Sequence, residues 1–324
     1  MGLVTEVVVA VDGGGTKTDA VALALNGEVL GRRRGPGSSP HSTGLSASVD
    51  LVDALVRDVA GSATVRHAGL YLSGLDLPRE LVAYQEAVAG LAWARQGIVI
   101  DNDLFALLRA GTDAPDAIAI VCGTGINAVG LRADGASVRF PSLGPISGDW
   151  GGGSGLGSEV LWHAARDVDG RGPHTLLTAA VCSTLGVATI PELIEQLHFG
   201  LRDSDELARL APDVFAAADA GDATAIELVI RQADEVVALA RACVNRLDLA
   251  EAAVPIVLGG GILQSRHELL MQRIAAGVAA IAPAATLVSI AHPPIVGAAV
   301  LALRAAGADR SATERARVAF SPAL

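Results

Sequence analysis

The sequence predicts an α/β protein built from two related domains, each with its own sheet. Two observations carry this prediction: a strand and hairpin unit that occurs twice, and an alternation of apolar strands with helical segments along the chain. The 324 residues are enough for about two domains. Because 51% of them are hydrophobic, the chain can bury a substantial core.

The repeated unit covers residues 7–31 and again residues 117–140. Each copy reads as an apolar strand, a glycine loop, a second apolar strand, a tight turn and a third strand. The turns are Asn26-Gly27 and Asp134-Gly135, pairs that favour hairpins because a type I′ turn needs positive φ at both central positions. The duplication predicts two related sheets that face each other across a cleft.

The remaining segments complete the two expected domains, which we place at residues 1–111 and 112–324. An alanine-rich, mostly helical insertion is expected at about residues 173–250. Four further strands are expected: one that ends at Ser73-Gly74, one that ends at Asp101, and two that cover 255–261 and 285–291. Four further helices are expected: three that cover 46–61, 79–89 and 103–111, and one that ends near Asp167.

Charge and hydropathy exclude several classes of protein. The chain carries 35 acidic and 24 basic residues, a formal net charge of -11, which makes it a poor partner for nucleic acid or an anionic membrane surface. The longest uncharged run, 274–303, is interrupted by Pro283 and Pro293-Pro294. We therefore interpret it as a helix end, a buried strand and a final helix rather than a membrane span.

The cysteines and the N-terminus indicate where the protein works. Cys122, Cys182 and Cys243 are odd in number and far apart, which fits neither a disulfide framework nor a zinc site. The first ten residues carry Glu6 and no basic segment, unlike a signal peptide. We expect a cytoplasmic protein.

The sharpest chemical motif directly follows the first strand. Consecutive glycines let backbone N–H groups approach a phosphate closely, and two threonines add hydroxyl donors. An aspartate at the strand end can hold a magnesium ion through water. A Walker A loop is excluded because a strand, not a helix, follows. The residues concerned are Asp12, Gly13, Gly14, Gly15, Thr16, Lys17 and Thr18, of which Lys17 is the only lysine in the chain.

A second glycine loop, Gly123-Thr124-Gly125, occupies the same position in the second copy of the unit. With Ala128 it formally matches a dinucleotide-binding fingerprint, but that site needs a helix after the loop. Here the sequence predicts a strand and a turn. We interpret the loop as a second phosphate clamp.

Two carboxylates, Asp101 and Asp103, lie where the strand 97–101 ends. Such strand ends are where the sites of α/β proteins gather, and a carboxylate there can accept the proton of a substrate hydroxyl as it attacks a γ-phosphate. Asp103 is one candidate, with the alternative that it caps the following helix. Asp101 is the competing carboxylate, and spacing does not decide between them.

Two later motifs are less specific. Asp149, between Gly148 and Trp150, is a candidate sugar-hydroxyl acceptor, metal-shell residue or helix cap. The glycines at 259–261 follow an apolar strand and leave room either for a flat base or for close packing of a helix on the sheet.

Taken in order, the two phosphate loops, the Asn-Asp between them and the late triple glycine resemble the superfamily of acetate kinases, sugar kinases, heat-shock chaperones and actin. More narrowly, the pattern resembles the BadF/BadG/BcrA/BcrD ATPase family and, within it, the eukaryotic-type N-acetylglucosamine kinases. The motifs span residues 7 to 303. The resemblance implies two RNase H-like (actin-like ATPase) domains that close over ATP and an amino sugar, and it suggests a homodimer.

The resemblance also assigns roles. Asp103 would be the catalytic base, Asp12 would bind magnesium, and residues 294–306 would form the closing helix of the large domain. The nucleotide would contact the first loop (12–18), the second loop and the late glycines, namely Gly123, Thr124, Gly125, Gly259, Gly260 and Gly261. The sugar would contact Ser39, Ser73, Gly74, Asn102, Asn127 and Asp149.

Two positions depart from the family pattern. Ser39 stands where an asparagine is expected, and Trp150 replaces the glutamate of Gly-Asp-Glu-Gly, where an indole can stack on a sugar face. The expected reaction is ATP- and Mg²⁺-dependent phosphorylation of an amino-sugar hydroxyl, first of all N-acetylglucosamine to its 6-phosphate. The alternatives are a kinase for glucosamine, N-acetylmuramic acid or a hexose, and an ATPase activator of a 2-hydroxyacyl-CoA dehydratase.

Overall fold

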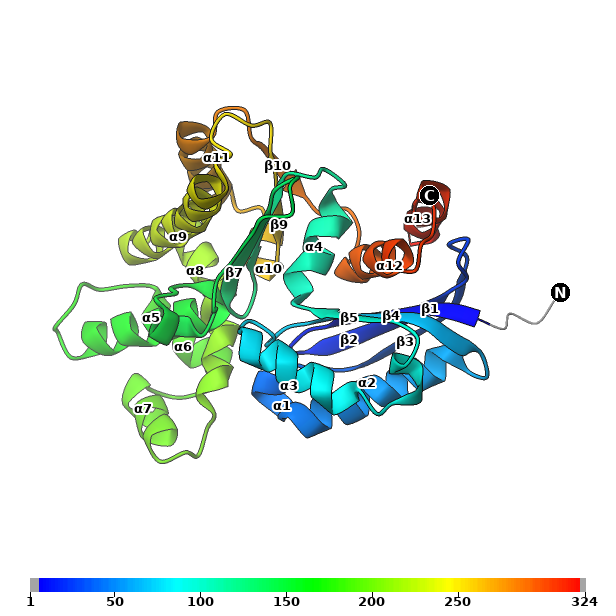
Figure 1. The fold of residues 1–324 in the computed structure, drawn as a ribbon. Helices are drawn as coiled ribbons and strands as arrows, with labels where there is room; N and C mark the ends of the chain where they lie inside the picture. The colour runs from blue at the N-terminus through cyan, green and yellow to red at the C-terminus, as the bar shows by residue number, and fades with distance from the viewer. Residues whose placement is uncertain (1–5, 321–324) are drawn as a thin grey trace. The chain divides into compact units, whose positions relative to one another are not determined.

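The computed structural model describes residues 6–320, which form two compact units. Unit 1 combines the described residues up to Ala119 with those from Val288 onward, and unit 2 runs from Ile120 to Leu287. Each unit contains one five-stranded sheet and its helices (Figure 1). The two-domain α/β class predicted from the sequence is therefore confirmed.

The sheet of unit 1 has the strand order β3-β2-β1-β4-β5. β1 pairs antiparallel with β2 and parallel with β4, so it occupies the centre of the sheet. Its apolar run is buried on both faces, which is why it reads as continuous rather than alternating. The strands are β1 (Glu6–Gly13), β2 (Lys17–Leu23), β3 (Val29–Pro36), β4 (Thr64–Leu72) and β5 (Ile98–Asp101).

Helices cover both faces of this sheet, as Figure 1 shows. One face carries α2, whose buried residues join those of β1 in a single core. The other face carries α12, which packs on β1 and β4 and against α4. The helices are α1 (Pro40–Thr43), α2 (Leu45–Ala60), α3 (Pro78–Val88), α4 (Asp103–Gly111), α12 (Pro294–Ala305) and α13 (Arg310–Ala319), with a 3₁₀ turn η1 (Ala92–Ala94).

The domain boundaries differ from the expected 1–111 and 112–324, because the C-terminal helices belong to unit 1. Small residues allow α12 to approach its neighbours closely. A Cβ at Gly297 would lie 1.8 Å from the carbonyl oxygen of Ala106, and one at Gly69 would lie 2.9 Å from the Cβ of Ala302. The helix expected to close the large domain therefore packs on the first sheet instead.

The sheet of unit 2 has the order β10-β9-β6-β7-β8, which repeats the order of unit 1 strand for strand. The chain passes between the units within β6 and within β10. The shared order confirms the duplication that the sequence predicts. The strands are β6 (Ala117–Cys122), β7 (Ile126–Leu131), β8 (Ser137–Arg139), β9 (Pro255–Gly259) and β10 (Thr286–Ser289).

The two hairpin turns share a geometry that differs from the expected one. In each turn only the glycine has positive φ, 89° at Gly27 and 92° at Gly135, so neither turn is type I′. The flanking bonds, from Ala24 N–H to the Glu28 carbonyl and from Arg132 N–H to the Ala136 carbonyl, enclose three residues. Both are three-residue hairpin loops with a left-handed glycine last.

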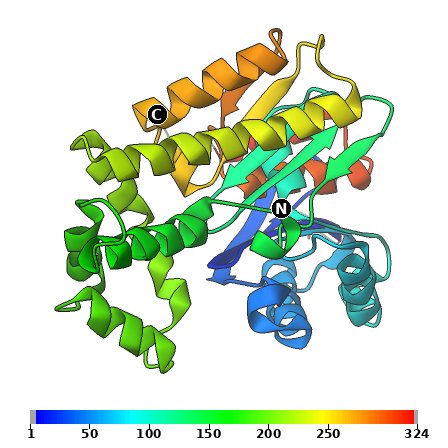
Figure 2. The same ribbon diagram turned by 90° about the vertical axis from the view of Figure 1, so that its left-hand side faces the viewer.

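Unit 2 carries the helical insertion, with α9 packed on β7 and along α11. Figure 2 shows α9 and α11 side by side over this sheet. The helices are α5 (Gly152–Val168), α6 (Leu177–Leu185), α7 (Ile190–His198), α8 (Ala211–Asp219), α9 (Ala223–Leu247), α10 (Gly261–Gln264) and α11 (Glu268–Ile281), with 3₁₀ turns η2 (Gly144–Ser147) and η3 (Ser204–Leu210).

The helix α5 begins inside the glycine-dense stretch, earlier than the sequence suggests. Its glycines are needed for close approach: a Cβ at Gly157 would lie 2.0 Å from the Leu207 carbonyl oxygen, and one at Gly152 would lie 2.6 Å from the Gly125 carbonyl carbon. Packing against η3 and the second glycine loop outweighs the poor helix propensity of glycine.

The uncharged run at 274–303 divides into the end of α11, β10 and most of α12. β10 is an edge strand whose residues are exposed or half-buried, so the expectation of a buried strand was wrong. Within the described residues, no single helix is long and apolar enough to cross a membrane. One bent pair, α6 with α7, passes that test by length and composition alone.

Replacing Gly297 with alanine should destabilise unit 1, because the new methyl group has no space at the crossing of α12 and α4. We expect the free energy of unfolding to fall by about 1–3 kcal/mol, the usual cost of overpacking. Urea denaturation would measure it. The control is Gly155→Ala in α5, where the nearest atom to the added Cβ is 4.0 Å away. Equal stability of the two variants would contradict this packing.

Candidate active site

The first glycine loop folds against the end of β3. The N–H of Gly14 donates to the carbonyl of Lys17 at 2.9 Å, and the N–H of Ser38 donates to the carbonyl of Gly14 at 3.1 Å. A Cβ at Gly13 would lie 2.2 Å from Ser38 Oγ, so only glycine fits there. Gly15, Thr16 and Lys17 at the tip of the loop are exposed.

Thr18 was expected to donate its hydroxyl to a phosphate, but its side chain points into the protein. Its side chain is fully buried, and its hydroxyl lies 2.7 Å from the Pro36 carbonyl oxygen and 2.8 Å from Ser38 Oγ. Thr18 therefore ties the loop to β3 and does not present its hydroxyl to a ligand. The exposed hydroxyl is that of Thr16.

Asp12 and Asp103 are two carboxylates of unit 1 whose pKa values are raised. Burial raises the pKa of Asp12 well above its usual range, and the charges of Asp103 and then Asp19 raise it further, while Lys17 lowers it. Burial raises the pKa of Asp103 to about 6, while the nearby backbone N–H groups of Asp103 and Leu104 oppose this increase. Such raised values are typical of functional carboxylates.

The structure separates the roles of the three polar residues around the start of α4. Asn102 is the helix cap, since its Oδ1 accepts the N–H of Leu104 at 3.0 Å and its Nδ2 donates to Asp76 at 2.9 Å. It is only 6% exposed, and its polar atoms are used within the protein. The expected sugar contact at Asn102 stays a prediction. Asp101 accepts the N–H of Asn102 at 2.7 Å, whereas Asp103, in the first turn, is the carboxylate that influences Asp12.

The predicted sugar contacts Ser39, Ser73 and Gly74 lie in one place beside the first loop. The N–H of Ser73 donates to the carbonyl of Gly13 at 2.8 Å. A Cβ at Gly74, where φ is 77°, would lie 2.7 Å from Ser39 Oγ. The Ser73 hydroxyl is buried and has no hydrogen-bond partner among residues 6–320. A ligand hydroxyl would satisfy it.

The second glycine loop is supported by the start of α5. The N–H of Gly153 donates to the Gly123 carbonyl at 2.7 Å, and the N–H of Ser154 donates to the Thr124 carbonyl at 3.0 Å. Behind the loop, a Cβ at Gly260 would lie 2.3 Å from the carbonyl oxygen of Cys122. The backbone at Gly260 therefore lies against the end of β6, which differs from the expected packing of a helix on the sheet. The expected contact of these glycines with a base stays a prediction.

Asn127 is 8% exposed, and its Oδ1 accepts the neighbouring N–H of Ala128 at 2.7 Å. Its exposed surface is therefore small. The expected sugar contact at this residue stays a prediction.

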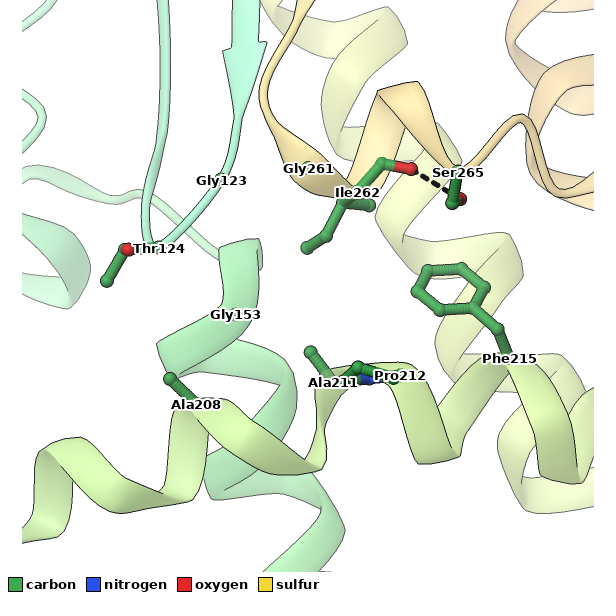
Figure 3. A pocket seen from close by; sticks show the side chains of 10 residues that line it. All are labelled: Gly123, Thr124, Gly153, Ala208, Ala211, Pro212, Phe215, Gly261, Ile262 and Ser265. Atoms are coloured by element: carbon green, nitrogen blue, oxygen red, sulfur yellow. Dashed lines mark hydrogen bonds between the residues drawn. The ribbon is translucent and has the colours of Figure 1, made fainter. Parts of the chain in front are cut away.

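A pocket of about 360 Å³ opens on one side of the second loop. Figure 3 shows the Phe215 ring and the Ile262 side chain projecting into it, with Thr124 at its far edge. Its walls are almost entirely apolar. The lining residues are Gly123, Thr124, Gly153, Ala208, Ala211, Pro212, Phe215, Gly261, Ile262 and Ser265. Of these residues, the sequence predicted only Gly123, Thr124 and Gly261. The others could not be predicted, because the alanine-rich helices carry no local motif that marks a ligand-binding surface.

A second pocket of about 360 Å³ opens on the other side of the same loop. It shares Thr124 with the first pocket but contains polar groups, including the predicted Asp149. The carboxylate of Asp149 accepts a hydrogen bond from the hydroxyl of Ser147. Trp150 and Glu159 form part of its wall. No sequence motif marks Glu159, which lies two turns into α5.

One face of the Trp150 ring is already occupied. The guanidinium carbon of Arg231 lies 4.0 Å from the ring centroid, and the indole N–H donates to Glu159 Oε1 at 2.8 Å. The expected stacking on a sugar therefore has only the opposite face available.

Comparison with known proteins decides the family. The sequence profile of the BadF/BadG/BcrA/BcrD ATPase family matches residues 9–302. The chain belongs to this family.

Relatives of the chain include sugar kinases. The N-acetyl-D-glucosamine kinase of Dictyostelium discoideum is 29% identical over 313 residues, which cover 92% of this chain and 98% of that protein. A solved structure from Chromobacterium violaceum, provisionally named an N-acetylglucosamine kinase, is 25% identical with a TM-score of 0.72, covering 92% and 98% of the two chains. A Streptomyces griseus ROK glucokinase, solved with glucose and AMPPNP, shares the fold at 18% identity and a TM-score of 0.54, covering 92% and 99%.

The raised pKa of Asp103 predicts a pH-dependent stability difference in Asp103→Asn. An unfolded aspartate ionises near pH 3.9, whereas folded Asp103 ionises at about 6, so the wild type loses stability as pH rises between these values. Asparagine carries no charge at either pH. We expect the variant to melt at least about 2 °C higher than wild type at pH 8, about 1 kcal/mol. This advantage should vanish near pH 4, and a difference that stays constant with pH would contradict the burial of this carboxylate.

Proposed function

We propose that this family member transfers the γ-phosphate of ATP to a hydroxyl of an amino sugar, with N-acetylglucosamine and its 6-phosphate as substrate and product. The observation that carries the proposal is the pair of pockets that share Thr124. An apolar pocket suits a nucleotide base, and a polar pocket suits a sugar. The phosphates of a bound nucleotide must lie between base and acceptor, where the Gly123–Gly125 loop lies.

Asp103 is the proposed base for this reaction. Asp103, with a pKa of about 6, is mostly ionised at neutral pH yet remains basic enough to take a proton from the attacking hydroxyl. Little covalent chemistry is needed of the protein, so positioning and charge stabilisation dominate.

The carboxylates of unit 1 also fit a magnesium ion. Asp12 is half-buried beside the charges of Asp103 and Asp19, and Lys17 opposes their effect on its pKa. Asp19 is itself paired with Arg34 at 2.6 Å. A hard divalent cation prefers such oxygen ligands and would relieve their repulsion. Asp12 would hold the ion, directly or through water, and the ion would neutralise charge on the phosphates.

Lys17 is the basic side chain of the first phosphate loop. It is exposed at the start of β2 and close enough to lower the pKa of Asp12. In a chain of net charge -11, a lysine at this position would offset repulsion between the protein and the nucleotide. We assign it to binding of the phosphates.

The alternative of a dehydratase activator is less well supported. Such proteins hold an iron–sulfur cluster with cysteine thiolates, but burial raises the pKa of Cys122 to about 12 and that of Cys243 to about 12. Buried thiols of this kind are poor ligands.

Cysteine usage and the family resemblance support a cytoplasmic homodimer, which we add to the proposal.

Replacing Asp103 with asparagine should lower sugar-dependent kcat by about 10²–10⁴-fold, the usual contribution of a general base. A coupled ADP-release assay over amino sugars and hexoses would measure it. In the wild type, kcat/KM should fall below about pH 6 as Asp103 is protonated. The matched control is Asp101→Asn, which should stay within a few-fold of wild type. Full turnover in Asp103→Asn would rule this residue out as the base.

Replacing Lys17 with methionine should raise the KM for ATP about 10-fold, a loss of about 1.4 kcal/mol of binding energy, and leave the KM for sugar unchanged. Initial rates at varied ATP and fixed saturating sugar would measure it. Lys17→Arg keeps the charge and should recover most of the affinity. If both variants bound ATP like the wild type, Lys17 would have no part in phosphate binding.

A further inference from the structure

The polar pocket of unit 2 contains a second carboxylate besides Asp149. Glu159 lies on α5, and its side chain is 26% exposed at the pocket wall. Its Oε1 accepts the indole N–H of Trp150, while its Oε2 has no hydrogen-bond partner among residues 6–320. A carboxylate oxygen without a protein donor, on a side chain that is mostly buried at a pocket wall, is well suited to accept a hydrogen bond from a ligand.

Glu159 is held in position from two sides. Besides the indole N–H, the Arg231 Nη1 lies 3.6 Å from Glu159 Oε1. The same guanidinium stacks on the Trp150 ring. Each of the three side chains therefore restrains the other two. A carboxylate restrained before binding loses little rotamer entropy when a ligand arrives, so its hydrogen bond contributes more to affinity.

The surroundings of the pocket are acidic. Burial raises the pKa of the nearby Glu235 above its usual value, an effect that Arg231 opposes. The charges of Asp234 and Asp149 add to the increase. Arg231, the cation among these groups, is already committed to Trp150 and Glu159. An anionic ligand would meet repulsion here, whereas the hydroxyl groups of a neutral sugar find acceptors.

We propose that Glu159 is a specificity-determining residue of the acceptor pocket, where its free oxygen accepts a hydroxyl hydrogen bond from the sugar beside Asp149. Trp150 and Arg231 are the positioning residues that hold it. The acceptor is accordingly a sugar without an acidic substituent, which excludes a carboxylated amino sugar such as N-acetylmuramic acid. This inference rests on the proposed kinase function and narrows its substrate class.

The test compares steady-state constants of Glu159→Gln and wild type, with N-acetylglucosamine as the acceptor. We expect the KM for sugar to rise at least 10-fold, with the KM for ATP within about 2-fold of wild type, because only the acceptor pocket changes. The matched control is Glu195→Gln, an exposed glutamate on α7 of the same unit. It should leave every constant unchanged.

A second variant, Trp150→Phe, removes the N–H donor and keeps an aromatic ring for Arg231. If Glu159→Gln does not fold, this variant carries the test: it should raise the KM for sugar several-fold without changing the KM for ATP.

In the wild type, kcat/KM for N-acetylmuramic acid should be at least 10-fold below that for N-acetylglucosamine.

Two failures are distinguishable. If wild type turns over with sugar but the substitutions leave its KM unchanged, or if the anionic sugar is preferred, the role of Glu159 is overturned and the kinase function stands. If no sugar increases ADP release by the wild type, the proposed function itself fails and the inference fails with it.

Discussion

The candidate site of unit 1 depends on two carboxylates that are buried close enough for their charges to repel. Asp12 ends the central strand and Asp103 begins α4, and the charge of one raises the pKa of the other. Burying like charges is costly unless a cation or a proton compensates. Burial raises the pKa of Asp103 to about 6, and a divalent cation bound by Asp12 would relieve the repulsion, which is why we propose phosphoryl chemistry at this end of the sheet.

The two glycine loops, which we propose as phosphate-binding sites, are shaped by backbone contacts and contain few basic side chains. Each loop lies between the first two strands of its sheet, and each is supported from behind by neighbouring backbone. Gly14 is tied to Ser38 in unit 1, and Gly123 to Gly153 in unit 2. Support of this kind fixes backbone geometry before a ligand binds. The duplication thus provides one glycine loop in each unit, and we propose that both bind phosphate.

Much of the fold could be predicted because it is encoded locally. The helix 103–111 and the order of strands and loops in both repeats follow from apolar runs, glycines and turn residues. The hairpin type could not, because Asn-Gly and Asp-Gly also suit a three-residue loop with glycine last. The place of α12 on the first sheet depends on contacts between segments far apart in sequence, such as Gly297 with Ala106.

The site was predicted less completely than the fold. Asp103 carries a raised pKa as a base requires, but Asn102 and Thr18 use their polar groups within the protein. Trp150 reads in the sequence as the loss of a family carboxylate. In the structure its indole N–H binds Glu159, a residue nine positions away that no motif marks.

Phosphorus NMR of the products tests the central claim most directly. With ATP and N-acetylglucosamine, the account predicts that ADP and a phosphomonoester of the sugar accumulate in equal amounts, with the phosphorus coupled to the protons on carbon 6. Release of ADP together with inorganic phosphate alone, at a rate independent of sugar, would identify an ATPase and contradict the account.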